Sequence, residues 1–404
     1  MTELQASSRL RPRGSNHVGM RQFNERVVLQ AIRLHGALPK AEIARLTHLT
    51  PQTVQLIIGR LEGDGLVVKQ APVRGKVGQP SVPMALNPDG AFSIGIKIGR
   101  RGMDMLLVDF TGQVRERLVR TYAFPDPRSL FDEIADGLAE LRGWLGPERA
   151  RVLHGVGVAA PLSLGGWESL LGVSAEAAQA WALIDIRARV AALTELPVVF
   201  VKDTAAACVA ELVAGRGRGM RSYLYIFVDT FIGGGLVLDS HLRGGVSGNA
   251  GAVGSLALGT NDGSGLPRQL LSLASLFDLE ARWREAGLAE QAWLDERALS
   301  EPWLPITEAW LRDACPGIAL AVHTAACLLD LEGVIIDGSF GRGLLAALLR
   351  ELTVALDGYS WEGVARPEVL PGTIGSDARA MGGALLPLYA NFAPDRDLFL
   401  KLEP

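Results

Sequence analysis

The sequence predicts an α/β protein in two parts, with a winged helix-turn-helix at the N-terminal end and a two-lobed α/β body behind it. Three observations predict this fold. A capped helix follows a short helix and a turn within residues 37–80. Beyond residue 90, apolar strands that contain glycine alternate with helical segments. Two such halves each open with a strand hairpin, which indicates two lobes with a cleft between them.

The helix-turn-helix pattern begins with two helices, expected from Asn24 to about His35 and over Lys40–Leu46. Thr50 and Pro51 then start a further helix, as its N-cap and its first residue. Apolar side chains at positions i, i+3, i+4 and i+7 of this helix form one buried stripe, made of Val54, Ile57, Ile58 and Leu61. Asp64-Gly65 turns the chain into a strand, and a basic, glycine-bearing hairpin tip follows as the wing.

The face opposite the buried stripe offers hydrogen-bonding side chains near the start of the last helix. A recognition helix places such side chains against base edges in a major groove, while basic residues nearby contact phosphates. The alternative is a set of ordinary amphipathic helices. The candidate DNA-binding residues are Lys40, Arg45, Thr50, Gln52, Thr53, Gln55, Arg60, Lys69, Arg74 and Lys76.

The length and composition of the chain indicate how many domains it has and exclude several classes of protein. A chain of 404 residues with 48% hydrophobic residues suggests two or three domains with large cores. No apolar run is long enough for a membrane span, and the N-terminus lacks the apolar segment of a secretory signal, so we expect a cytoplasmic protein. The three cysteines are scattered and form no CxxC pair, which argues against a disulfide framework and a structural zinc site.

The charge is distributed unevenly along the chain. Residues 1–80 hold 12 Lys and Arg against 5 Asp and Glu, a net +7, whereas the rest of the chain carries −11. A basic N-terminal part fits contact with phosphates. Within it, residues 1–23 are predicted to be a flexible basic arm, either solvated or touching DNA.

Strands and helices of the body can be placed by their patterns. Strands are expected at 91–99, 103–114, 115–124, 152–162, 197–203 and 333–340, with a hairpin over 223–242 that has Gly233, Gly234 and Gly235 near its centre. Helices are expected at about 127–145, 184–193, 205–214, 269–285, 306–329 and 377–389.

Several stretches together resemble the ROK family (repressors, open reading frames and kinases) in its regulator branch. They are GSNHVGMRQFNERVVLQAIRLHG, GQPSVPMALNPDGAFSIGIKIG, GVGVAAPL, PVVFVKDTAAACVAEL, GNAGAVGS and GTIGSDARAMGGAL, which together span nearly the whole chain. The resemblance implies an actin/hexokinase-like fold, assembly as a homodimer or homotetramer, and regulation of transcription in response to a sugar. It implies domains at 24–82 (winged helix-turn-helix) and 83–404 (kinase-like body, with lobes at about 91–205 and 206–375).

The chain departs from the kinase members of that family at three motifs. The run Lys97-Ile98-Gly99-Arg100-Arg101 stands where those members carry Asp-x-Gly-Gly-Thr for phosphate. The pair Lys202-Asp203 stands for their catalytic Asn-Asp, and Asp203 has three open roles: a base, a ligand contact or a helix cap paired with Lys202. Gly251-Ala252-Val253-Gly254-Ser255 stands for Gly-Glu-x-Gly-His, so the carboxylate and imidazole of the sugar and zinc sites are missing.

We therefore expect no catalytic residue, no metal and no cofactor, and a pocket unlike that of ordinary hexose binders. Its candidate ligand-binding residues are Asp203, Lys202, Gly248, Asn249 and Ser255. The predicted function is a DNA-binding regulator, most simply a repressor of carbohydrate genes, whose partners are a double-stranded DNA operator and a sugar effector. Two alternatives stay open, namely a body that only oligomerises or docks a protein, and a sugar kinase.

Overall fold

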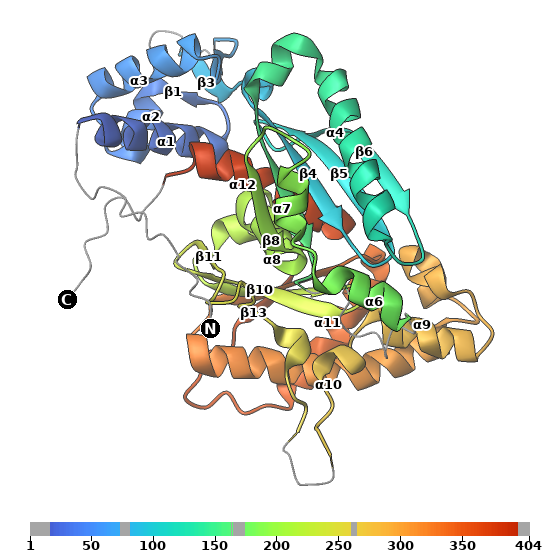
Figure 1. The fold of residues 1–404 in the computed structure, drawn as a ribbon. Coiled ribbons are helices and arrows are strands. Elements are labelled where there is room, and N and C mark those ends of the chain that lie inside the picture. Colours follow the sequence, from blue (N-terminus) through green and yellow to red (C-terminus); the bar gives the residue numbers. More distant parts are fainter. Residues whose placement is uncertain (1–16, 73–80, 163, 165–173, 260–264, 395–404) are drawn as a thin grey trace, which may run out of the picture. The chain divides into compact units, whose positions relative to one another are not determined.

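The computed structural model describes residues 17–72, 81–162, 164, 174–259 and 265–394. These residues form two compact units (Figure 1). The head contains the chain up to Ala91, together with Asp109–Thr111 and the chain from Leu388 onward; the body contains Phe92–Val108 and Gly112–Pro387. None of the described helices is long and apolar enough to cross a membrane.

The head is a winged helix-turn-helix. Its elements are α1 (His17–His35), β1 (Leu38–Pro39), α2 (Lys40–Thr47), α3 (Pro51–Gly63), β2 (Val67–Lys69) and β3 (Pro83–Leu86), with the strands in the order β1-β3-β2. The predicted cap of α3 is present, since Thr50 Oγ1 accepts a hydrogen bond from the backbone N–H of Thr53 at 3.1 Å. The predicted apolar stripe of α3 is buried in the core of the head.

Two expectations about the head need correction. α1 starts at His17, so Asn24 lies inside a helix and does not cap one, and only residues 1–16 of the predicted arm lie outside the described residues. The boundary expected at residue 83 is also wrong, because β3 begins there and pairs with both β1 and β2. The predicted wing tip, with Arg74 and Lys76, lies outside the described residues.

The first lobe of the body is a five-stranded sheet in the order β6-β5-β4-β7-β8, with β4, β7 and β8 parallel and β5-β6 an antiparallel hairpin. Its strands are β4 (Phe92–Ile98), β5 (Gly102–Asp109), β6 (Val114–Thr121), β7 (Leu153–Ala160) and β8 (Val198–Lys202). Helices α4 (Pro127–Arg149), α6 (Ala175–Ala182) and α7 (Ile186–Ala191) contribute apolar side chains to the core that covers this sheet. The sequence did not predict α6, whose alanine-rich pattern is short.

The second lobe repeats this plan with the order β11-β10-β9-β12-β13. Its strands are β9 (Tyr223–Val228), β10 (Ile232–Leu238), β11 (His241–Arg243), β12 (Gly333–Gly338) and β13 (Glu368–Pro371). Helices α9 (Leu276–Glu285), α10 (Leu304–Leu329) and α11 (Arg342–Asp357) enclose a core with this sheet. α11 and β13 were not predicted, and α9 begins seven residues later than expected because a 3₁₀ turn at Leu270–Ser272 comes first.

Two helices, α8 (Asp203–Ala214) and α12 (Ala378–Phe392), join the cores of the lobes. Glycine allows their close approach. A Cβ on Gly382 of α12 would lie 1.7 Å from the carbonyl oxygen of Ala206 on α8, and one on Gly157 of β7 would lie 1.8 Å from the carbonyl oxygen of Gly383. The backbones therefore touch where any side chain would separate them.

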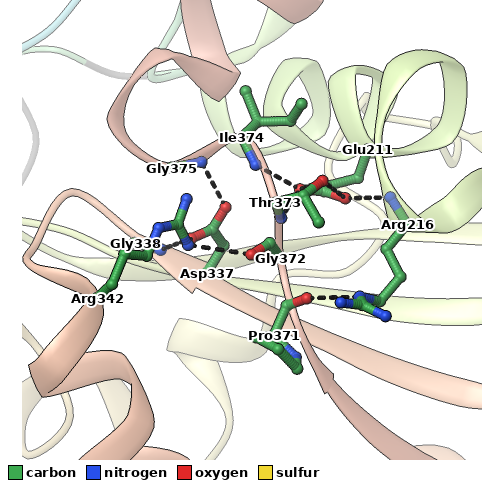
Figure 2. Close-up of polar contacts among 10 residues, drawn as sticks. All are labelled: Glu211, Arg216, Asp337, Gly338, Arg342, Pro371, Gly372, Thr373, Ile374 and Gly375. Atoms are coloured by element: carbon green, nitrogen blue, oxygen red, sulfur yellow. Dashed lines mark hydrogen bonds and ion pairs between the residues drawn. The ribbon is translucent and has the colours of Figure 1, made fainter.

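Two buried carboxylates hold the loop that leads into α12 (Figure 2). Glu211 of α8 accepts backbone N–H groups from Thr373 at 2.5 Å and Ile374 at 3.0 Å. Asp337, at the end of β12, accepts the N–H of Gly375 at 2.7 Å and a guanidinium N–H of Arg342 at 2.9 Å. Burial raises the pKa of Asp337, against the opposing effect of these hydrogen bonds. The two carboxylates fix the start of α12.

Candidate functional site

The exposed face of α3 carries the predicted base-reading side chains. Gln52 and Gln55 are exposed and Thr53 is partly exposed, whereas the stripe behind them is buried. Thr50 lies at the same end, but its hydroxyl caps the helix and lies 2.8 Å from Thr53 Oγ1. The helix start therefore presents two glutamine amides to the solvent side, which is the arrangement expected of a helix that enters a major groove.

The described basic candidates in the head all have partners. Three of them form ion pairs, which join Arg45 to Glu42, Arg60 to Glu25 at 3.2 Å and Lys69 to Glu62 at 2.7 Å. Lys40 donates a hydrogen bond to the Gln55 amide oxygen at 2.7 Å. Exposed pairs of this kind contribute little to stability, so a phosphate can compete for these cations. Hydrogen bonding to Arg45 lowers the pKa of Glu42 and raises that of Arg45.

A pocket of about 270 Å³ lies in the body where β8 meets α8. It brings together segments that are far apart in the sequence, because the ends of β4, β7, β8 and β9 and the start of α12 all reach it. Four of the predicted ligand residues line it: Lys202, Asp203, Asn249 and Ser255. The fifth, Gly248, does not; it occupies a turn with φ +75° and lines no part of the pocket.

A buried arginine organises the charges of this pocket. Arg379 of α12 forms an ion pair with Asp229, which follows β9, and its Nη1 lies 4.0 Å from Asp203 Oδ2. Its Nη2 donates a hydrogen bond to the Ser339 hydroxyl at 3.1 Å. Burial alone would lower the pKa of Arg379, but the two carboxylates raise it overall; burial raises the pKa of Asp229, and Arg379 with Lys97 lowers it overall. Both groups are therefore charged at neutral pH.

The pairing of Asp203 with Lys202, which belonged to one of the three roles left open for it, is not present. The Asp203 carboxylate accepts the N–H of Thr204 at 2.8 Å and faces Arg379, and it forms no ion pair with Lys202. The sequence missed Arg379, Asp229 and Arg100 as pocket residues. The sequence offered only a weak signal for Arg379, a single arginine in the stretch GTIGSDARAMGGAL. Its partner Asp229 lies 150 positions earlier in the sequence, and only the fold places the two side chains together.

A second cavity beside the first lies along the run 97–101, where kinase members bind phosphate. Three of its cations are paired with carboxylates. Lys97 lies 3.2 Å from Asp104, and Arg101 donates to Glu280 at 2.6 and 2.9 Å; Arg117 pairs with Asp377. Burial, together with repulsion from Arg379, lowers the pKa of Lys97. Carboxylates of the chain thus neutralise the positions that would hold a phosphate chain.

Gly233, Gly234 and Gly235, predicted near the centre of a hairpin, lie inside strand β10. A Cβ on Gly233 would lie 2.8 Å from Thr204, and one on Gly235 would lie 2.6 Å from Cys208 Cβ. Gly233 and Gly235 therefore allow α8 to pack closely against this strand. Among the described residues, no group of three His, Cys, Asp or Glu side chains could hold a metal ion.

The ROK family model matches residues 93–388, and a winged helix-turn-helix DNA-binding model matches residues 24–68. A crystal structure of a ROK family transcriptional regulator, a homolog of the E. coli MLC protein, superposes with a TM-score of 0.64 at 18% identity, covering 93% of this chain and 98% of that one. The ROK hexokinase from Thermus thermophilus gives 0.53 at 23% identity, covering 73% and 97%. These likenesses confirm the predicted fold class.

The xylose repressor of Bacillus subtilis is 22% identical over 242 residues, which are 60% of this chain and 62% of the repressor. The match thus spans about three fifths of that relative's length. Because the ROK model covers most of the sequence, and because a winged helix-turn-helix precedes it, the resemblance stated from the motifs is confirmed: this chain belongs to the ROK family.

Proposed function

We propose that this protein is a sequence-specific DNA-binding regulator of transcription, a repressor of carbohydrate-related genes, whose body senses a sugar or sugar derivative. The observation that carries the DNA-binding part is α3, a capped helix that exposes Gln52 and Gln55 beside the cations of the head. The matches to a winged helix-turn-helix model and to a xylose repressor support it.

Sensing rather than catalysis is supported by the pocket. Asp203, the only residue retained from the kinase Asn-Asp pair, lies 4.0 Å from the guanidinium of Arg379 and accepts the backbone N–H of Thr204 at 2.8 Å. A carboxylate engaged by such partners is less available to take a proton from a substrate hydroxyl. Carboxylates of the chain also pair with two cations of the run 97–101, Lys97 and Arg101. We therefore propose a ligand pocket without kinase chemistry.

The assembly follows from the size of the head. A single recognition helix reads only a few base pairs, so useful specificity needs two heads on half-sites about 34–36 Å apart. We propose that the protein acts in the cytoplasm as a homodimer or a higher homo-oligomer on a palindromic operator.

Fluorescence anisotropy tests the proposal. The full-length protein is titrated on a DNA fragment from upstream of its own gene and on random DNA of equal length, at one salt concentration. Neutral and charged sugars are then added to the complex. Preference for the fragment together with a shift by one sugar supports the whole proposal. Preference without any sugar effect supports a body that only assembles or docks a protein, and equal binding of both DNAs contradicts the DNA-binding part.

A sugar kinase is the second candidate, favoured by the likeness to the Thermus thermophilus hexokinase. It predicts ATP-dependent phosphorylation of a hexose, measurable by coupled release of ADP. The regulator is supported over this candidate because Asp203 and Asp229 both lie against the guanidinium of Arg379, which leaves neither carboxylate free to act on a substrate.

A further inference from the structure

The pocket contains one ammonium group, that of Lys202, for which the contacts described above provide no partner. Lys202 ends strand β8, immediately before α8, and lines the pocket. Within the described part of the chain it makes neither a hydrogen bond nor an ion pair, and its neighbour Asp203 faces Arg379. Burial lowers the pKa of Lys202, and only the field of Asp203 opposes this. A partly buried cation without a partner is costly, so an anionic ligand group beside Lys202 would be stabilised.

The other charges of the pocket are committed. Asp203 and Asp229 both lie against Arg379, and Arg100 lies with its guanidinium 5.0 Å from the centre of the Phe231 ring. The lining thus carries three cations against two carboxylates. An anion that enters can reach Lys202 without breaking an ion pair, and it would cancel the excess positive charge of the lining.

We propose that the pocket binds a sugar derivative that carries one anionic group, a phosphate or a carboxylate, and that Lys202 is the partner of that group. The proposal deepens the sensing function and rests on it for the sugar part of the ligand. The uncharged side chains of Asn249, Ser255 and Thr230 line the same pocket and supply donors and acceptors for hydroxyl groups. A volume of about 270 Å³ suits a small ligand.

Binding of matched probes to the full-length protein tests the proposal. Isothermal titration would compare D-glucose, D-glucuronate, D-glucose 6-phosphate and inorganic phosphate. We expect one of the two charged sugars to bind roughly tenfold more tightly than glucose, because a hydrogen bond to a charged group is stronger than one between neutral groups. Tighter binding of glucuronate would identify the anionic group as a carboxylate, and tighter binding of glucose 6-phosphate would identify it as a phosphate.

Variants separate the role of charge from that of shape. Lys202→Met should remove the preference for the charged sugar, Lys202→Arg should keep most of it, and Arg187→Met, which removes an exposed cation from α7, should leave it unchanged. Equal binding of charged and neutral sugars, equal losses for both in Lys202→Met, or no binding of either charged sugar would overturn the proposal. Inorganic phosphate as tight as glucose 6-phosphate would also overturn it, because the sugar would then contribute nothing.

The DNA measurement keeps this proposal distinct from the regulator proposal. DNA preference without any effect of Lys202→Met on anion binding rejects only the ligand class. Selective binding of a charged sugar by a protein that prefers no DNA rejects only the regulator.

Discussion

Lys40, the first residue of α2, donates a hydrogen bond from Nζ to the amide oxygen of Gln55 on α3 at 2.7 Å. The contact joins the two helices of the helix-turn-helix at their exposed side. It also orients the Gln55 side chain, because the amide oxygen faces Lys40 and the NH₂ group faces away from it. Gln55 therefore presents donors, which suits an acceptor on a base edge such as guanine N7 or O6.

Sequence preference should depend on Gln52 and Gln55, and affinity on the cations. Gln52→Ala or Gln55→Ala should weaken binding to the preferred fragment by about 1–3 kcal/mol while hardly changing binding to random DNA. Arg60→Ala should weaken both DNAs alike, because a phosphate contact carries no sequence information. Anisotropy on the two DNAs at one salt concentration measures this. Equal losses on both DNAs for Gln52→Ala would remove Gln52 from the base-reading set.

Glu25 should restrain DNA binding through its ion pair with Arg60 at 3.2 Å. Glu25→Gln frees the guanidinium, so we expect tighter binding to any DNA. The salt slope should steepen by up to about 0.9, the value for one additional phosphate contact. Glu308→Gln, which removes the same charge from an exposed position on α10, is the control. Unchanged affinity and an unchanged slope in Glu25→Gln would show that the ion pair does not restrain Arg60.

The hydrogen bonds by which Glu211 holds the loop before α12, here called the clamp, should contribute strongly to the stability of the body. Glu211 is fully buried and accepts hydrogen bonds from three backbone N–H groups, those of Arg216, Thr373 and Ile374. Glu211→Ala leaves these donors without an acceptor, so the free energy of unfolding should fall by about 3–5 kcal/mol. Urea denaturation measures the loss. Glu308→Ala should change it by less than about 0.5 kcal/mol, and a similar small effect for Glu211→Ala would contradict the clamp.

The ion pair of Asp229 with Arg379 should make the body sensitive to acid. The pKa of Asp229 is lowered in the folded protein, so the carboxylate stabilises the fold above its unfolded pKa of about 4, and this stabilisation is lost as the pH falls through the folded value. Asp229→Asn should be about 3–5 kcal/mol less stable at pH 7 and should lose less on acidification. The exposed Asp136→Asn is the control. Parallel stability curves for Asp229→Asn and the native protein would exclude this assignment.

The end of α12 should support the head. Leu388 is buried in the head core, and the Phe392 ring contacts Phe110 edge-on with centroids 4.8 Å apart. Leu388→Ala should destabilise the head by about 2–5 kcal/mol. Hydrogen exchange of the α1 and α3 amides in the full-length protein should report this as faster exchange. The matched control is Leu328→Ala, at a position 76% exposed on α10. Unchanged exchange in Leu388→Ala would show that the head is stable without this contact.

The sequence by itself determined the features of this protein that arise between residues close together in the chain, namely helix starts and buried helix faces. Thr50 and Pro51 start α3, and the spacing of Val54, Ile57 and Leu61 defines its buried face, because capping and helical periodicity act within a few residues. The α/β alternation and the motif-bearing glycines predicted the body and its family in the same way. Lys202, Asp203, Asn249 and Ser255 were found because they stand in recognisable motifs next to a strand or a turn.

Tertiary structure alone decided which charges meet. Arg379 reaches Asp229 across 150 positions, Arg101 reaches Glu280 across 179, and Glu211 accepts from Thr373 across 162. No local pattern distinguishes these side chains from solvated ones. Each contact joins segments that are far apart in the sequence and that meet only in the folded protein. The same reason hid β3, whose pairing completes a sheet with β1 and β2. Local propensity therefore specifies the elements of this protein, and long-range packing specifies the electrostatics of its pocket.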